Sequence, residues 1–135
     1  MSVSTGINSV HAISLARGVT TAATVYWVAP WAGTLSAVKV VDTANVTAND
    51  TNYMTVTATN VGSDGSGSTA MASGNSKATG GLTFAANVAT ALTNSSTPAD
   101  LKFSAGDVIK VVAAASGIGT FTNATLQLDV IPGQG

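Results

Sequence analysis

Apolar and polar side chains alternate with a period of two along the clearest stretches of this sequence, and that period most constrains its fold. In residues 52–60, Met54, Val56 and Ala58 occupy every second position, and threonine occupies most of the positions between them. Residues 124–131 alternate leucine and valine with polar residues in the same way. Because successive side chains of a β-strand point to opposite faces, both stretches predict strands with one buried face.

Turn signals divide the rest of the chain into further short segments. We predict strands at residues 21–29, 34–41 and 69–73, and residues 107–115 are apolar enough to predict a strand that is covered on both faces. Residues 82–92 predict another strand or a helical turn, because alanine is frequent there. Segments rich in Gly, Pro, Asn and Ser separate these elements, at residues 30–33, 46–51, 62–68, 74–81, 93–99 and 104–107.

This order of elements predicts an all-β fold, a single jelly-roll-like antiparallel β-sandwich over residues 19–135. About seven or eight strands, with a turn about every 8–15 residues, are typical of sandwiches and jelly rolls. Strands do not alternate with helical segments, which argues against a parallel α/β sheet.

The first 18 residues differ from the rest, since their apolar residues follow no sustained period. We expect an extended N-terminal arm at residues 1–18, joined to the sandwich near Gly18. A first strand preceded by a frayed end is the alternative. In the arm interpretation, the apolar side chains are candidate contacts with a neighbouring subunit, and they are Val3, Ile7, Val10, Ile13 and Leu15.

Charge is scarce throughout the chain. Charged residues make up 8% of the sequence and the net charge is −1, whereas about 25% is usual in soluble proteins. Five basic residues cannot neutralise many phosphates, so we expect no nucleic-acid partner. No apolar run approaches the length of a membrane-spanning helix, so we expect no membrane span. A surface with so few charges suits a protein that is packed against other proteins.

Residues that carry catalysis or bind metals are few. The chain has no cysteine, a single histidine (His11) and six acidic residues, all of them aspartate. Nucleophilic catalysis needs a nucleophile with a positioned base, and no such arrangement is evident. Oxygen ligands for calcium gather in residues 42–52, but their spacing fits turn-forming side chains better. We therefore predict that the protein is not an enzyme and that it holds no cofactor or metal.

Three aromatic residues, Tyr26, Trp27 and Trp31, lie close together in the sequence on either side of Pro30. Such a cluster could form a platform on which a sugar stacks. Packing in the core or at a subunit interface is the more common role of such residues, and we count Trp27 and Trp31 among the candidate subunit contacts.

Four segments together suggest a family. They read VAPWAGTLSAVK at residues 28–39, DTNYMTV at 50–56, NVGSDGSG at 60–67 and LKFSAGDVI at 101–109. In order and spacing, over about residues 21–131, they resemble the head decoration (cement) proteins of tailed bacteriophages that are built on a small jelly roll or β-sandwich. The first 20 residues carry no matching motif.

The resemblance implies a structural virion protein on the outer surface of the capsid. It would be a homotrimer that binds the major capsid protein and stabilises the contacts between neighbouring capsid subunits. The arm and the two tryptophans would then supply capsid or subunit contacts. The alternative is a phage fibre or carbohydrate-binding β-sandwich module, and weak glycan binding is compatible with either function.

Overall fold

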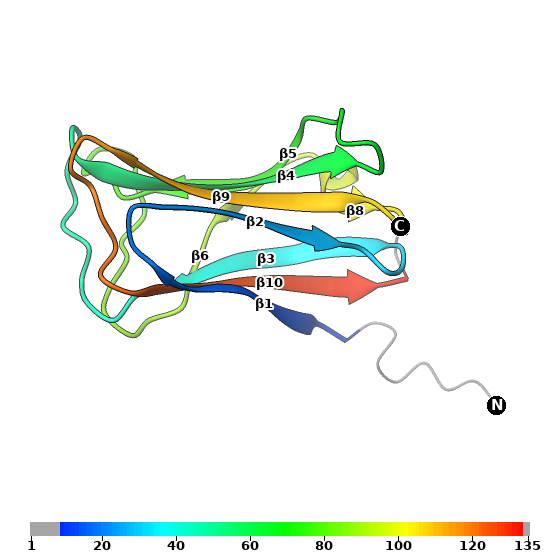
Figure 1. Ribbon diagram of the computed structural model, residues 1–135, viewed down its shortest axis with the longest axis horizontal. Helices are drawn as coiled ribbons and strands as arrows, with labels where there is room; N and C mark the ends of the chain where they lie inside the picture. Colours follow the sequence, from blue (N-terminus) through cyan, green and yellow to red (C-terminus); the bar gives the residue numbers. More distant parts are fainter. Residues whose placement is uncertain (1–8, 134–135) are drawn as a thin grey trace.

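Two antiparallel β-sheets pack face to face in the computed structural model, which describes residues 9–133 (Figure 1). One sheet contains β1 (His11–Val19), β10 (Ala124–Pro132), β3 (Gly33–Val41), β6 (Thr90–Ala91) and β8 (Lys102–Phe103). The other contains β2 (Ala22–Val28), β9 (Val108–Ser116), β4 (Tyr53–Gly62), β5 (Thr69–Asn75) and β7 (Thr93–Asn94). One 3-10 turn, η1 (Pro98–Leu101), precedes β8, and no α-helix occurs within the described range.

The strand order is that of a jelly roll. The sheets run β1-β10-β3-β6 and β2-β9-β4-β5, and β8 pairs with β3 beside β6. The chain changes sheet between β1 and β2, between β2 and β3, and again between β3 and β4, as a jelly roll requires. The predicted all-β sandwich is therefore confirmed.

The alternating pattern places the core between the sheets. Met54, Val56 and Ala58 of β4 are buried, and so are Leu126, Leu128 and Val130 of β10. The threonines between the β4 residues point away from the core, where they are partly exposed. Burial of one face of each strand, worth roughly 25 cal/mol for each Å² of apolar surface, explains why the period of two in the sequence sets the sheet face.

The N-terminal region corrects one expectation. Residues 11–19 do not form an arm but the edge strand β1, which pairs with β10 from His11 opposite Val130 to Val19 opposite Ala124. The alternative of a first strand is the correct one for this part, since Val19 is buried and Ile13 packs on the core. The expected contacts Val3 and Ile7 lie outside the described residues.

Residues 82–92 correct another expectation, because they form mostly irregular chain rather than a continuous strand or a helical turn. Only β6 at their end pairs with β3, yet Phe84 and Leu92 are buried and fix the segment to the core. The expected loop at residues 93–99 contains the short strand β7 and the beginning of η1.

The central strand β9 was expected to be covered on both faces, and this too is corrected. Ile109, Val111 and Ala113 are buried between the sheets, but Val112 on the other side is only half-buried. Its cross-strand neighbours Thr24 and Thr57 are small, and no second layer lies over them among the described residues. The described residues contain no helix that is long and apolar enough to cross a membrane.

Candidate functional sites: an uncharged sheet face and a loop pocket

The outer side of the β2-β9-β4-β5 sheet is a broad surface with almost no charge. Residues paired across antiparallel strands share a face, and one such row is Thr24, Val112, Thr57 and Ser73. We call this surface the threonine-rich face. Its side chains, following the strand pairing, are Ala22, Thr24, Tyr26 and Val28 of β2, Val108, Lys110, Val112, Ala114 and Ser116 of β9, Tyr53, Thr55, Thr57 and Thr59 of β4, and Ala70, Ser73 and Asn75 of β5.

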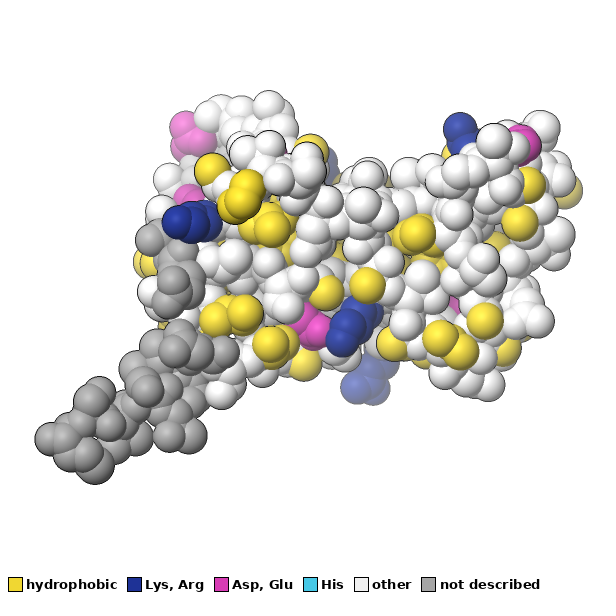
Figure 2. Space-filling view, turned by 180° about the vertical axis from the view of Figure 1, so that it is seen from behind, with side chains coloured by type: hydrophobic (Ala, Val, Ile, Leu, Met, Phe, Trp, Pro, Cys, Tyr) yellow, Lys and Arg dark blue, Asp and Glu magenta, His cyan; other side chains and the backbone are white. Residues whose placement is uncertain are grey.

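Lys110 is the one charged residue of the threonine-rich face. Beside it, Tyr26 and Val28 are each 60% exposed, although they are large and apolar. Both belong to β2, an edge strand that pairs only with β9 over residues 9–133. An open, uncharged face next to an open strand edge is the kind of surface that proteins use to associate. Figure 2 views the molecule from behind and shows its basic and acidic side chains scattered among uncharged and hydrophobic ones.

Trp27 lies on the other side of the same strand, and Trp31 lies in the turn that follows it; both are partly buried against the core. The rings of Trp27 and Phe103 meet edge to face with their centroids 5.4 Å apart, and Trp31 lies 5.6 Å from Trp27. Trp31 also contacts the His11 ring, at 5.7 Å between centroids. Core packing is therefore their role in the isolated chain. Tyr26, as the neighbour of Trp27 in a strand, points to the opposite face, so the alternative of an aromatic platform for a sugar is not supported, and the core packing given as the more common role is what the tryptophans show.

The remaining predicted contact residues also divide into side chains that pack on the core and one that is exposed. Ile13 and Leu15 are partly buried and pack against the core, whereas Val10 is 52% exposed just before β1. Of the described candidates, Val10 alone is strongly exposed. Val28 was not among the predicted contacts, and Tyr26 was considered only as a residue on which a sugar stacks. The alternation in β2 could have placed both on the open face.

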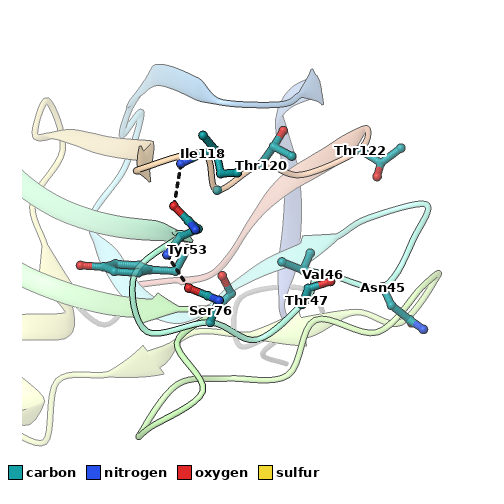
Figure 3. Close-up of a pocket in the computed structure, with 11 residues that line it drawn as sticks. Asn45, Val46, Thr47, Tyr53, Ser76, Ile118, Thr120 and Thr122 are labelled. Atoms are coloured by element: carbon teal, nitrogen blue, oxygen red, sulfur yellow. Dashed lines mark hydrogen bonds between the residues drawn. The ribbon is translucent and has the colours of Figure 1, made fainter.

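A pocket of about 340 Å³ lies at the end of the sandwich opposite the described chain ends (Figure 3). Two loops form most of it, residues 42–52 between β3 and β4 and residues 117–123 between β9 and β10, and Tyr53 and Ser76 complete it. Val46 and Thr47 of the first loop face Thr120 of the second across the opening in Figure 3. The residues that line the pocket are all uncharged. They are Asn45, Val46, Thr47, Asn49, Asn52, Tyr53, Ser76, Ile118, Gly119, Thr120 and Thr122.

Asp42 connects the two loops through hydrogen bonds to the backbone of both. Its buried carboxylate accepts hydrogen bonds from the backbone N–H groups of Thr43 at 2.8 Å, Thr122 at 3.0 Å and Asn123 at 2.8 Å. Asp50 accepts from the backbone N–H and the hydroxyl of Thr79, which lower the pKa of the Asp50 carboxyl. Both aspartates thus hold the backbone of the loops in place. The described residues contain no cluster of acidic or histidine side chains suited to a metal.

Tyr53 stands at the rim, where the threonine-rich face meets the pocket. The neighbouring Ser116 hydroxyl lowers the pKa of the Tyr53 phenol, and the Lys77 ammonium, 4.7 Å from the ring centre, acts in the same direction. Lys77 is thereby held over the ring rather than directed into the pocket.

Comparison with known proteins finds no similar protein. No protein-family model, no curated protein and no solved structure matches this chain. The protein is therefore defined by its fold, a small charge-poor jelly roll, and by the two surfaces described above.

Proposed function

We propose that this protein is a structural component of a phage particle, which binds the outer surface of the head as a trimer and stabilises contacts between major capsid subunits. The threonine-rich face is the observation that carries the proposal. It is open, its nearby charges are Lys110 and, over the Tyr53 ring at its margin, Lys77, and it presents Tyr26 and Val28 to solvent. The cores of protein interfaces are likewise poor in charge and rich in aromatic residues.

The size of the face argues for several copies acting together. Four strands about 4.8 Å apart and about seven residues long cover roughly 500 Å², whereas a stable interface buries about 800 Å² on each partner. A single copy is thus too small to bind tightly through this face. A trimer presents three such faces, and linked binding sites raise the overall affinity by orders of magnitude.

Stabilisation would follow from mass action. A trimer that contacts several capsid subunits binds the assembled arrangement better than it binds separate subunits. The free energy of binding then opposes disassembly of the head. No catalytic group is needed for this function.

The first experiment measures the mass in solution by light scattering coupled to gel filtration. The chain has a mass of 13.2 kDa, so a trimer, as a closed cyclic assembly, would have about 40 kDa. A monomer at micromolar concentration would contradict a pre-formed trimer. It would move the fibre or carbohydrate-binding module to first place.

The second experiment measures attachment to undecorated heads by co-sedimentation. Thr57→Lys places a cation at the centre of the threonine-rich face, where binding would have to desolvate it in every copy, and we expect attachment to weaken at least about tenfold. Thr43→Lys is the matched control, an exposed threonine in the 42–52 loop away from the face. Equal attachment of both variants would exclude this face as the capsid contact.

The N-terminal contacts are tested separately by deleting residues 1–8. Because β1 begins at His11, this deletion leaves the described sheet complete. If Val3 and Ile7 contact the capsid, attachment weakens while the thermal unfolding midpoint stays the same. Unchanged attachment would remove these two residues from the proposal.

A further inference from the structure

We propose that the loop pocket binds an uncharged, hydroxyl-rich ligand of the size of one or two sugar rings. The pocket lies between the 42–52 and 117–123 loops, at the opposite end of the sandwich from the aromatic cluster. The proposal is independent of capsid binding. It also differs in place from the sugar platform expected at Tyr26, Trp27 and Trp31.

The chemistry of the lining points to a neutral ligand. Charged residues do lie near the pocket, but each is already engaged. Asp42 accepts three backbone N–H groups, Asp50 is bonded to Thr79, and Lys77 lies over the Tyr53 ring. A charged ligand would find no opposite charge in the lining, and its desolvation would be uncompensated.

Three asparagine side chains at the pocket have a fixed orientation. The Oδ1 atom of Asn45 accepts from the Ala86 N–H at 2.7 Å, and that of Asn52 accepts from the Ile118 N–H at 3.0 Å. Asn49 Oδ1 accepts from the N–H groups of Thr51 at 2.8 Å and Asn52 at 2.7 Å. Because each oxygen accepts a backbone N–H group, the Nδ2 group of each amide is left as the remaining donor, and in Figure 3 the Asn45 side chain points away from the opening.

These Nδ2 donors have no partner within the described part of the chain. The hydroxyl groups of Thr47 and Thr122 add further groups that can donate and accept, since they too make no described hydrogen bond. Sugar hydroxyl oxygens accept hydrogen bonds from amide donors and donate to threonine oxygens. The set thus complements a polyhydroxylated molecule better than it complements a cation, which would need the oxygens already in use.

Parts of the pocket wall are also closely packed. A Cβ at Gly119 would lie 2.5 Å from the backbone carbon of Tyr53 and 2.6 Å from its nitrogen, so only glycine allows this close approach of the loop to β4. Ser76, which is buried, accepts the Met54 N–H with its Oγ at 2.9 Å on the far side. A pocket whose walls are already in place loses little conformational entropy when it binds.

The apolar part of the pocket suits the C–H faces of a sugar ring. Val46 and Ile118 lie among the polar residues, and Ile118 is 84% exposed. Small-molecule sites typically combine apolar surface with a few oriented polar groups in roughly 300–1,000 Å³. The volume of about 340 Å³ falls at the lower end, which limits the ligand to one or two rings.

The test is saturation-transfer NMR on the full chain, with glucose, galactose, mannose, N-acetylglucosamine and glucuronic acid at up to about 10 mM, a concentration that detects millimolar affinity. We expect at least one neutral sugar to bind, and the charged glucuronic acid to bind more weakly. In ¹⁵N-labelled protein, the bound sugar should shift the side-chain amide signals of Asn45, Asn49 or Asn52.

A pair of variants locates the site. Thr47→Trp fills the pocket from an exposed position that makes no described side-chain hydrogen bond, and we expect affinity to fall at least tenfold. Thr43→Trp is the matched control, the same change in the same loop outside the lining, and we expect it to bind as the unaltered protein does. Both should unfold at the same temperature as the unaltered protein.

Three results would overturn the proposal. They are the absence of binding by every neutral sugar in the panel, equal binding by the Thr47→Trp and Thr43→Trp proteins, and shifts confined to residues outside the two loops. Head attachment serves as the independent readout. Because the pocket is distinct from the threonine-rich face, Thr47→Trp should leave attachment unchanged whether or not sugar binds.

Discussion

Lys39 and Asp129 form an ion pair across β3 and β10, with Nζ and Oδ2 3.0 Å apart, on the outer side of the sheet that contains β1. The two partners are unequally exposed. The Asp129 side chain is 5% exposed and that of Lys39 is 39% exposed. Gln127 donates a further hydrogen bond to Asp129 Oδ1 at 2.8 Å.

This inequality predicts an asymmetric response to substitution. Lys39→Met leaves a buried carboxylate with Gln127 as its remaining partner, and we expect it to lower the free energy of unfolding by about 2 kcal/mol. Asp129→Asn leaves an ammonium that water can solvate, and we expect a loss of about 1 kcal/mol. Urea unfolding of both variants checks the order, and the reverse order would contradict the burial argument.

Substitution of Asp42, at the pocket end of the sandwich, should lower the free energy of unfolding more than substitution of Lys39 or Asp129. Asp42→Ala removes the acceptor for the backbone N–H groups of Thr43, Thr122 and Asn123, two of which belong to a distant loop. We expect a loss of about 3 kcal/mol, and of about 1 kcal/mol for Asp42→Asn, which keeps one oxygen acceptor. Thermal unfolding measures both. Asp64→Ala, in an exposed turn, is the control and should cost less than either.

The close packing around Gly119 predicts that a methyl group added at this position destabilises the pocket end of the sandwich. The atoms that a Cβ would meet are backbone atoms of Tyr53, which cannot move without shifting β4. We expect Gly119→Ala to lower the free energy of unfolding by about 3 kcal/mol. Gly65→Asn is the control, since Gly65 has a φ of +80° in open space and asparagine tolerates that conformation. A neutral Gly119→Ala would show that the loop can relax.

Acid should loosen the 42–52 loop through Asp50. Hydrogen bonds from Thr79 lower the pKa of Asp50 below the usual 3.8, so the charged form is favoured in the folded protein. The contribution to stability is therefore present above pH 3.8 and is lost as the pH falls through the lowered pKa. NMR titration of the Asp50 carboxyl checks this, with Asp50→Asn expected to remove the corresponding change in the Thr79 amide shift. A midpoint at or above 3.8 would contradict the prediction.

The strands of regular period could be predicted from the sequence, whereas β1 could not. In β4 every second residue is apolar, so the inward face is unambiguous. In β1 the register shifts between Ser14 and Ala16 and again between Ala16 and Val19. Each irregularity moves the next apolar side chain out of the period of two, and the strand then resembles an irregular arm.

Of the candidate sites, the sheet face could be predicted in part from the sequence, and the pocket could not. Adjacent residues of a strand point to opposite faces, so the separation of Tyr26 from Trp27 follows from β2 once its strand character is accepted. The pocket does not follow from the sequence, because its lining comes from separate loops that only tertiary structure brings together. Its asparagines also read as ordinary turn residues, and Asn49 does form such a turn.

The pairing of His11 with Val130 places the beginning of β1 beside the end of β10. Figure 1 shows this end of the sandwich opposite the loops that form the pocket. A peptide or fluorescent protein fused to the chain would therefore join the described part of the sandwich at the end opposite the pocket. The fold thus offers a display scaffold in which fused cargo and the loop pocket lie at opposite ends of the sandwich.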